Sequence, residues 1–352
     1  MSLKSCFNCL KFSLALCFLL VLQPSYSQYN FTAVDDLITA NKKMFDNDLV
    51  VLIYKDGKVV YKNETNKEFT LKTQAPIASC SKWLTAALVM TFVDEGKISL
   101  DDKVSTYLPV FSKYSKGYIT IRQCLSHTTG IEADNSALKN ILQRRKFANL
   151  EEEVNAFASK RAIEKNPGEL FHYSNVGLNI AARVCEVVSK KTFDRLITER
   201  ILRPLKMRGT TFTIDYDAAP NPSGGAKSTA VDYMNFLTMI LNKGTFETKR
   251  ILSAEAVAEM QKVQTGNAAI GYTPKVADGF SYGLGEWIIE TSSTGTASAV
   301  ASPGLFGTWP VVDNCRGYAC IFFVKSILSE KRKDFYVQLK EAIDEQIKST
   351  CN

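Results

Sequence analysis

The sequence predicts an α+β fold, in which one sheet is assembled from both ends of the chain around an inserted, mostly helical lobe. Strand-like runs occur near the amino end, at Leu49–Tyr54 and Lys58–Lys62, and strand character returns near the carboxyl end. Between them, apolar residues recur at helical spacing. We therefore expect a body made of about residues 35–80 and 270–350, and a helical lobe of about residues 81–269.

The first 27 residues have the layout of a secretory signal peptide. Two lysines precede an apolar run from Phe12 to Leu22, and Pro24–Ser27 offers small residues at the two positions that determine cleavage. The run is too short to span a bilayer, so we expect no stable membrane insertion after cleavage, and not a retained membrane anchor. The remaining domain, residues 28–350, would be exported to a periplasm or secreted.

The composition is that of an ordinary globular protein of 352 residues, with 45% hydrophobic and 22% charged residues. Removal of the signal takes away two lysines and no acids, which lowers the formal net charge from +7 to +5. The basic clusters that remain, Arg144–Lys146 and Lys331–Lys333, are short and lack interleaved aromatic residues. They are typical of solvated helix faces, so we expect no nucleic-acid partner.

Both halves of the predicted sheet have turn and strand signals. Lys55-Asp56-Gly57 is a strong hairpin signal between the first two runs. Toward the carboxyl end, strand character covers Tyr282–Glu290, Leu305–Asp313 and Tyr318–Lys325. A last amphipathic helix follows, with five apolar residues on one side: Phe335, Leu339, Ala342, Ile343 and Ile347.

One helix of the lobe has clear end signals. Ser228 or Thr229 could cap its start, and Gly244 could end it. Its predicted apolar face is formed by four residues: Val231, Met234, Leu237 and Leu241.

The most informative segment for function is Ser79-Cys80-Ser81-Lys82, at the start of an apolar stretch. In a helix, residues three apart share a face, so the Ser79 hydroxyl and the Lys82 amine become neighbours. A serine hydroxyl is a weak nucleophile until a base takes its proton, and a nearby neutral amine can do this. The helix N-terminus adds a partial positive charge, which favours developing anions. The segment therefore predicts a nucleophile and its base.

Six cysteines remain after the signal, and none has the spacing of metal ligands. Cys315 and Cys320 flank a four-residue stretch, so they either close a disulfide across a hairpin or remain two free thiols. We expect no metal and no cofactor.

Five further segments join the Ser79–Lys82 pattern. They are Asp101–Pro109, Ile119–Ile131, Pro167–Asn175, Ile201–Met207 and Tyr282–Trp287. In this order and spacing the set resembles the serine β-lactamase and penicillin-binding-protein superfamily, nearest to the branch of class C β-lactamases, D-stereospecific peptidases and related esterases. The resemblance covers about residues 35–345. It implies a three-layer sandwich, an antiparallel sheet flanked by helices, with a mostly helical lobe inserted.

The resemblance also implies an acyl-enzyme mechanism and assigns roles. Ser79 would be the acylated nucleophile, and Lys82 would hold or accept its proton. Tyr173 would be the second proton carrier, and Asn175 would orient Lys82 and substrate amides. The backbone N–H groups of Ser79 and Leu305 would stabilise the oxyanion.

The sequence departs from the family at Ser302-Pro303-Gly304, where the family has Lys-Thr-Gly, or His-x-Gly in esterase-like branches. Gly304 is kept, which would let a substrate backbone approach closely. Ser302 replaces the cation or imidazole, which should weaken carboxylate binding by about 1.5–3 kcal/mol. Lys227 is another candidate source of the missing cation. This change favours esters or peptides over β-lactams as substrates.

The expected function is therefore an exported serine hydrolase that acts on a small-molecule or peptide acyl substrate. The alternatives are a β-lactamase or penicillin-binding D-amino-acid carboxypeptidase, and a non-catalytic binding descendant of the fold. A Ser–His–Asp triad would need His127 or His172, but the chain has no G-x-S-x-G elbow. We interpret His127 as a structural loop residue. Gly224-Gly225 either lines the cleft, as a similar family segment does, or forms a plain loop.

Overall fold

The computed structural model describes residues 29–133, 147–212, 219–266, 268–326 and 330–351. The chain divides into a short amino-terminal unit, Met1–Asn30, and one compact unit, Phe31–Asn352, whose architecture is given below. None of the helices in the described ranges is both long enough and apolar enough to cross a membrane.

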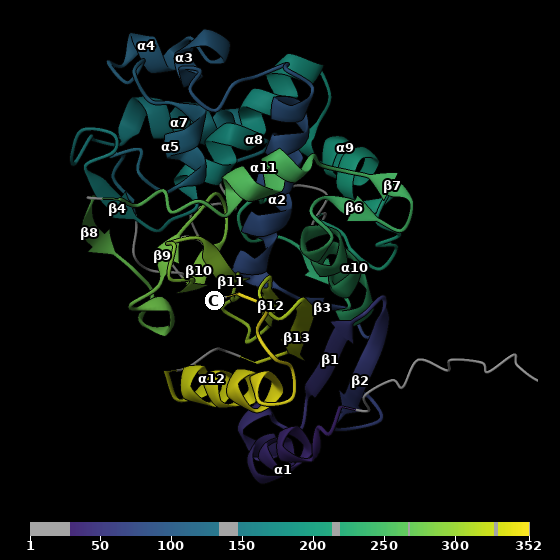
Figure 1. Ribbon diagram of the computed structural model, residues 1–352. Helices are drawn as coiled ribbons and strands as arrows, with labels where there is room; N and C mark the ends of the chain where they lie inside the picture. The colour runs from purple at the N-terminus through teal and green to yellow at the C-terminus, as the bar shows by residue number, and fades with distance from the viewer. Residues whose placement is uncertain (1–28, 134–146, 213–218, 267, 327–329, 352) are drawn as a thin grey trace, which may run out of the picture. The chain divides into compact units, whose positions relative to one another are not determined.

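A seven-stranded antiparallel sheet forms the centre of the compact unit, in the order β2-β1-β13-β12-β11-β10-β9 (Figure 1). The pairing of β1 with β13, Leu49 opposite Val324, joins the two ends of the chain as the sequence predicted. The strands are β1 (Leu49–Lys55), β2 (Lys58–Glu64), β9 (Ser281–Tyr282), β10 (Trp287–Thr291), β11 (Ala297–Ala301), β12 (Trp309–Asp313) and β13 (Tyr318–Val324).

Helices cover both faces of this sheet, which explains why the strands β11, β12 and β13 are buried along their whole length. Every residue of β13 is buried, and its side chains alternate between the two faces. Phe322 stacks on Tyr336 of α12 (Glu330–Asp344), whereas Phe323 stacks on Phe69 on the other side. Figure 1 shows α1 (Thr32–Asn41) beside α12 on one face and α10 (Ala230–Leu241) on the other. The three-layer α+β sandwich is confirmed.

The helical lobe surrounds α2 (Ser81–Asp94), which is buried from Ser81 through Phe92 and therefore has no polar face. The other helices of the lobe are α3 (Val104–Tyr107), α4 (Val110–Lys113), α5 (Ile121–Leu125), α7 (Leu150–Lys160), α8 (Val176–Ser189), α9 (Phe193–Ile197) and α11 (Ala254–Met260). Short helical turns are η1 (Lys42–Phe45), η2 (Ala78–Cys80), η3 (Thr198–Leu202) and η4 (Lys275–Ala277).

Three two-stranded ribbons connect these helices. They are β3 (Ala75–Pro76) with β5 (Lys227–Ser228), β4 (Leu170–His172) with β8 (Ala269–Tyr272), and β6 (Thr245–Phe246) with β7 (Lys249–Arg250). The strands of the first and third ribbons are antiparallel, and those of the second are parallel.

The strand predictions are confirmed at the amino end and only partly at the carboxyl end. The predicted hairpin is present, and its turn has positive φ at both Asp56 and Gly57, as a type I′ turn requires. The predicted strand Leu305–Asp313 was wrong in its first half, because Gly307 adopts φ +93° in a turn and the strand begins at Trp309. A second turn, at residues 283–286, divides the predicted strand Tyr282–Glu290 into β9 and β10.

The helix predictions were close. Thr229 caps α10, because its side chain accepts a hydrogen bond from the Asp232 N–H. Val231 is 37% exposed, so it does not belong to the buried face that the spacing predicted. In the last helix the predicted apolar residues are buried, but Ile347 lies beyond the end of α12 at Asp344.

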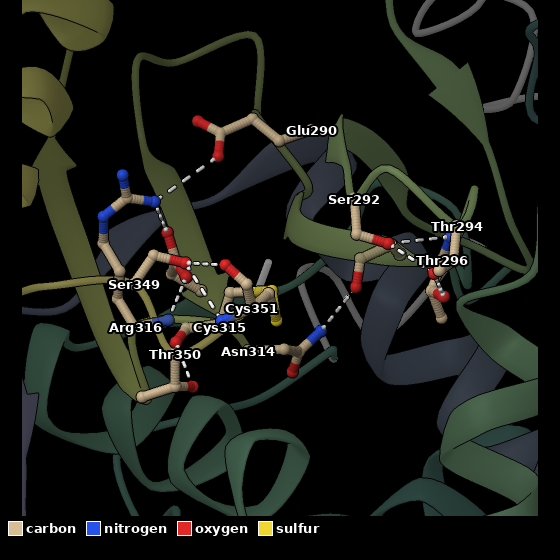
Figure 2. The surroundings of a disulfide bond; sticks show 12 residues. Glu290, Ser292, Thr294, Thr296, Asn314, Cys315, Arg316, Ser349, Thr350 and Cys351 are labelled. Atoms are coloured by element: carbon tan, nitrogen blue, oxygen red, sulfur yellow. Dashed lines mark hydrogen bonds and ion pairs between the residues drawn. A yellow bond between two sulfur atoms is a disulfide. The ribbon is translucent and has the colours of Figure 1, made fainter.

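The disulfide joins Cys315 to Cys351, with Cα atoms 5.1 Å apart (Figure 2). The candidate pair Cys315–Cys320 was therefore wrong, and Cys320 is a buried free thiol. The reason is the register of the sheet, because Cys320 lies inside β13 opposite Val311, away from the turn that holds Cys315.

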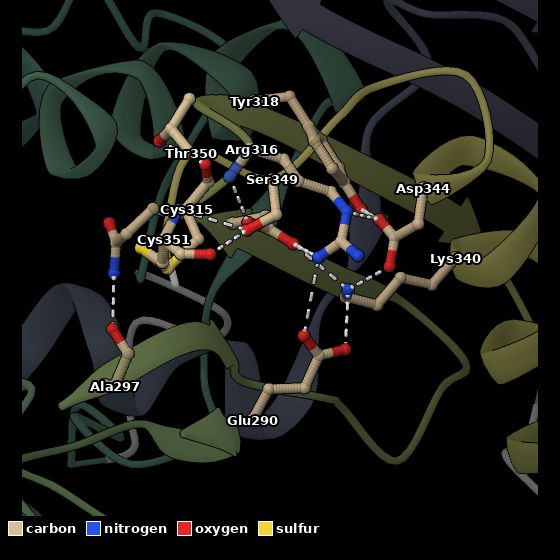
Figure 3. Close-up of polar contacts among 12 residues, drawn as sticks. Glu290, Ala297, Cys315, Arg316, Tyr318, Lys340, Asp344, Ser349, Thr350 and Cys351 are labelled. Atoms are coloured by element: carbon tan, nitrogen blue, oxygen red, sulfur yellow. Dashed lines mark hydrogen bonds and ion pairs between the residues drawn. A yellow bond between two sulfur atoms is a disulfide. The ribbon is translucent and has the colours of Figure 1, made fainter. Parts of the chain in front are cut away.

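Ion pairs also hold the carboxyl-terminal helix onto this turn (Figure 3). Lys340 Nζ lies 3.1 Å from the buried Asp313 and 2.7 Å from both Glu290 and Asp344. Arg316 also pairs with Asp313, at 3.2 Å. These three carboxylates come close enough to one another to hold a metal, but each of them already pairs with a cationic side chain.

Candidate active site

Ser79 lies on η2, a single helical turn that runs directly into α2. Ala78, just before it, has φ +43°, a left-handed conformation that is costly for a residue other than glycine. Lys82 is the second residue of α2, and its amine lies 3.2 Å from the Ser79 hydroxyl oxygen. The predicted neighbourhood of the hydroxyl and the amine is confirmed, although Ser79 precedes the α-helix.

The Lys82 side chain is almost completely buried, with 1% of the residue exposed. Besides Ser79, its amine donates to the side-chain oxygen of Asn175 at 3.1 Å and to the backbone carbonyl of Ser223 at 2.9 Å. These three acceptors come from three separate segments of the chain. The buried amine is thereby stabilised by oxygen acceptors from all three.

Tyr173 follows β4 and completes the group around Ser79. Its phenol lies beside the Ser79 side chain, and the Lys82 amine lies 4.8 Å from the centre of its ring. Burial raises the pKa of the Tyr173 phenol well above its usual range, and the interaction with the Ser79 side chain opposes this rise. The phenol is therefore protonated at neutral pH.

Asn175 stands at the start of α8, but its side chain does not cap that helix. Residues of this type usually accept a bond from the first turn of the helix. Here the side-chain oxygen accepts from Lys82 instead, as the resemblance implied. The structure thus brings Ser79, Lys82, Tyr173 and Asn175 together.

Ser223 is a functional residue that the sequence reasoning missed. Its carbonyl accepts from Lys82, and its hydroxyl lies 3.0 Å from the Asn175 carbonyl and 2.6 Å from the Asn179 side-chain oxygen. The sequence feature that could have pointed to Ser223 is the adjacent pair Gly224-Gly225. A Cβ at Gly225 would lie 2.8 Å from the side chain of Asn221, so the tight turn requires a glycine. This segment lines the site and is not a plain loop.

The stretch Ser302–Leu305 follows β11 and turns back over η2. Ser302 is buried, and Leu305 lies in the turn with its side chain partly exposed. A Cβ at Gly304 would lie 2.2 Å from the carbonyl oxygen of Ile77. The glycine is therefore required by a contact inside the protein, and the substrate approach that we expected there stays a prediction.

A second contact ties the same turn to the nucleophile. The Cys80 thiol donates to the carbonyl of Thr308 at 3.5 Å, and the Cys80 carbonyl accepts from the Tyr233 hydroxyl at 2.8 Å. The residue after Ser79 is thus held from two sides. Lys227 pairs through its backbone with Pro76, and no bond between Lys227 and Ser302 occurs among the described residues. Its role as a substitute cation stays a prediction.

The two histidines lie close to Tyr173 but take no part in a Ser–His–Asp triad in the described structure. His127 bonds to the Tyr282 hydroxyl at 3.1 Å, and His172 lies 3.2 Å from Glu164. The side chain bonded to the Ser79 hydroxyl in the position of a base is Lys82.

Glu286 is a buried acid beside the site, in the segment between β9 and β10. It is fully buried, and neither of its carboxyl oxygens has a hydrogen-bond partner among the described residues. Burial therefore raises the pKa of Glu286 well above its usual range, which favours the neutral form of the carboxyl group in the folded protein. Its neighbour Gly285 packs against the main chain of Lys82.

A helical turn and the buried helix after it place a serine and a lysine beside a tyrosine, next to an antiparallel sheet between helical layers. This is the arrangement of the β-lactamase-like serine hydrolases. The model of the Beta-lactamase family matches residues 46–341. The chain belongs to this family.

Two solved structures and one group of curated proteins are similar to this chain. A provisionally named β-lactamase from Bacteroides dorei DSM 17855 is 31% identical, covers 90% of this chain and 99% of its own, and superposes with a TM-score of 0.79. EstCE1, a hydrolase with promiscuous acyltransferase activity, is 19% identical, covers 88% and 97%, and has a TM-score of 0.72. At this identity the likeness shows the fold alone.

Protein flp of Staphylococcus aureus (strain MW2) is 30% identical over 172 residues, which are 46% of this chain. The match spans only 34% of the length of that protein. The chain therefore covers about a third of these curated relatives.

Glu286→Gln should stabilise the protein increasingly as pH rises. Between the pKa of an unfolded glutamate, about 4.3, and the raised pKa in the folded state, the unfolded chain binds fewer protons than the folded protein. The stability of the wild type therefore falls by up to about 1.4 kcal/mol per pH unit in this window, and glutamine removes that fall.

Urea unfolding of both proteins at about pH 5, 6 and 7 measures this difference in the free energy of unfolding. Glu255→Gln, on the exposed surface of α11, is the matched control and should give a constant difference. A constant difference for Glu286→Gln as well would contradict a neutral buried carboxyl group.

Proposed function

We propose that this protein is a serine hydrolase that is acylated on Ser79 by an ester or peptide-type substrate and then deacylated by water. The observation that carries this proposal is the position of one hydroxyl between two proton-handling groups. The Lys82 amine lies 3.2 Å from the Ser79 oxygen, and the Tyr173 phenol lies beside the same side chain. Nucleophile and base within bonding reach are the signature of covalent catalysis.

The three partners of Lys82 define how it would act as the base. As an ammonium group it has three N–H donors for three acceptors. When neutral it has two N–H groups and one lone pair. The Ser223 carbonyl and the Asn175 side-chain oxygen can only accept, so the lone pair must face the Ser79 hydroxyl, which can donate. The neutral amine is thus oriented to take the proton of the nucleophile.

Tyr173 would supply the proton that the leaving group needs. When the Ser79 oxygen bonds to the substrate carbonyl carbon, its proton passes to Lys82. Collapse of the intermediate breaks the bond to the leaving group, which takes the phenol proton of Tyr173, and Lys82 then returns its proton to the phenolate. The raised pKa of Tyr173 supports this order, because the phenol is a donor before the reaction begins.

The backbone N–H groups of Ser79 and Leu305 would bind the oxyanion. The contacts of Gly304 with Ile77 and of Cys80 with Thr308 fix the turn that holds Leu305 against η2. Donors that are held in place before the reaction need no reorganisation in the transition state.

Ser302 supports esters or peptides as the substrate class. It replaces the cation that binds the carboxylate of penicillin-type substrates, and the described residues place no cation in bonding contact with it. EstCE1, with this fold, is a hydrolase with promiscuous acyltransferase activity. A β-lactamase or D-amino-acid carboxypeptidase is the second candidate, favoured by the name of the Bacteroides dorei relative. A non-catalytic binding protein is the third.

We also propose that the protein is exported. The apolar run Phe12–Leu22 supports a signal peptide. The disulfide between Cys315 and Cys351 supports an oxidising compartment, because Cys351 is exposed and such bonds are reduced in the cytosol.

Ser79→Ala should abolish labelling by a fluorophosphonate probe, because the probe phosphonylates an activated serine. Mass spectrometry of the intact protein measures the adduct. Ser159→Ala, at a partly exposed serine on α7, is the control and should label like the wild type. A folded wild type that takes no label would favour the non-catalytic alternative.

Lys82→Ala should lower the rate of acylation at least about a hundredfold, the low end for general-base groups. Lys82→Arg should lose about as much, because a guanidinium group stays charged and cannot accept the proton. Stopped-flow measurement of the nitrophenol burst gives this rate. A loss of tenfold or less in both variants would mean that another group is the base.

Short-chain nitrophenyl esters should be better substrates than a chromogenic cephalosporin, compared by kcat/KM. Ser302→Lys should raise cephalosporin acylation by about tenfold to a hundredfold, the range that corresponds to a charge-assisted hydrogen bond. Cephalosporin turnover by the wild type at enzyme-like rates would reverse this ranking of substrates.

The exported protein should lack residues 1–27 and contain one disulfide. Intact mass after expression in a host with a secretory pathway measures both, and thiol-reactive alkylation before and after reduction should differ by two groups. A full-length chain recovered from the cytosol with six reactive thiols after the signal would contradict export.

A further inference from the structure

We propose that His127 is a positioning residue that holds the Tyr173 phenol against Ser79. The inference rests on the proposed function, because it assigns to Tyr173 the proton-donor role described above. It differs from the expectation that His127 is only a structural loop residue.

His127 bonds to the backbone on both sides of Tyr173. Its carbonyl accepts from the His172 N–H at 2.9 Å, and its ring nitrogen Nδ1 accepts from the Ser174 N–H at 3.4 Å. The N–H of Tyr173 itself donates to the Tyr272 carbonyl at 3.0 Å. Three successive backbone donors are thus paired, two of them with one residue, so the main chain that carries the phenol has little freedom to shift.

The His127 ring also packs directly on the Tyr173 ring. The ring centres are 4.6 Å apart, and the next contacts are with Tyr282 at 4.9 Å and Phe171 at 6.0 Å. Trp287 closes another side of Tyr173 at 5.1 Å. The imidazole therefore restrains the side chain of Tyr173 as well as its backbone.

The hydrogen bonds define the tautomer of His127. A backbone N–H can only donate, so Nδ1 is unprotonated and Nε2 carries the hydrogen, which points to the Tyr282 hydroxyl 3.1 Å away. The ring is 3% exposed, and its burial and the nearby Lys82 and His172 side chains lower the pKa of His127 well below its usual value. It is neutral at physiological pH and has no hydrogen bond to Ser79 among the described contacts.

The backbone of His127 fits a positional role. Its φ of +59° lies in the left-handed region, which costs free energy for residues other than glycine and is tolerated best by asparagine. In this conformation the carbonyl and the ring of His127 can both accept hydrogen bonds from the segment 172–174. Asparagine at 127 would suit the backbone and could place an oxygen near the position of Nδ1.

Two esters with different leaving groups test this proposal. A general loss of structure would slow the hydrolysis of both, whereas a misplaced phenol would mainly slow the hydrolysis of one. A nitrophenolate leaves without protonation, whereas an alkoxide needs a proton from Tyr173. If His127 positions the phenol, His127→Leu should lower kcat/KM for an alkyl ester by about a hundredfold and for the nitrophenyl ester by about tenfold or less. Tyr173→Phe should show the same imbalance. His127→Asn should restore alkyl-ester turnover to within about fivefold of the wild type.

The experiment measures both esters with all four proteins, together with thermal unfolding of each. Equal losses on the two esters in His127→Leu, or an asparagine variant no better than leucine, would overturn the proposal. If His127→Leu does not fold, Tyr282→Phe takes its place. It removes only the hydroxyl bonded to Nε2, and it should shift the ratio of the two esters in the same direction by about threefold or more.

An unchanged ratio in Tyr282→Phe would then overturn the proposal. A wild type that hydrolyses neither ester would overturn the proposed function and this inference together. Turnover by the wild type with a balanced loss in the variants overturns this inference alone.

Discussion

The burial of the Lys82 amine is the constraint on which the rest of the site depends. An amine removed from water is tolerated only if its hydrogen-bonding groups are satisfied. Its acceptors are Ser79 on η2, Asn175 at the start of α8 and Ser223 in a glycine-rich turn, three segments far apart in the chain. Keeping this one group paired therefore draws the nucleophile turn, the helical lobe and the glycine turn to a single point.

Around that point several residues have conformations or unpaired polar groups that cost free energy. A purely structural core would avoid them. Ala78 and His127 have left-handed backbones, and Glu286 is buried without a polar partner among the described residues. Strained and unsatisfied groups of this kind concentrate at functional sites, where the surrounding packing holds them. Here the packing comes from α2, which is buried on every side, and from the aromatic residues around Tyr173.

The sequence predicted those features that depend on local spacing. A separation of three residues was enough to pair Ser79 with Lys82, and hydrophobic periodicity placed the sheet at the two ends of the chain. It did not reveal β11, whose small residues have a weak strand signal, or Cys351 as the partner of Cys315, which depends on where the chain end folds back. Ser223 was missed because its contact with Lys82 is made by a backbone carbonyl, and any residue type provides one.

In the turn after β11, the contacts that hold the backbone in place are separate from the side chain that would contact the substrate. Its position is set by the close approach of Gly304 to the Ile77 carbonyl and by the Cys80–Thr308 bond, and neither contact involves the side chain of Ser302. The residue at 302 can therefore change without moving the backbone that would bind the oxyanion. If Ser79 is acylated as proposed, a chain that keeps Gly304 but not the family cation would keep the means for that step, while it would give up a charge that selects for carboxylate-bearing substrates. On this argument the replacement at Ser302 would alter which substrates are bound, and it leaves intact the contacts between Ser79 and Lys82.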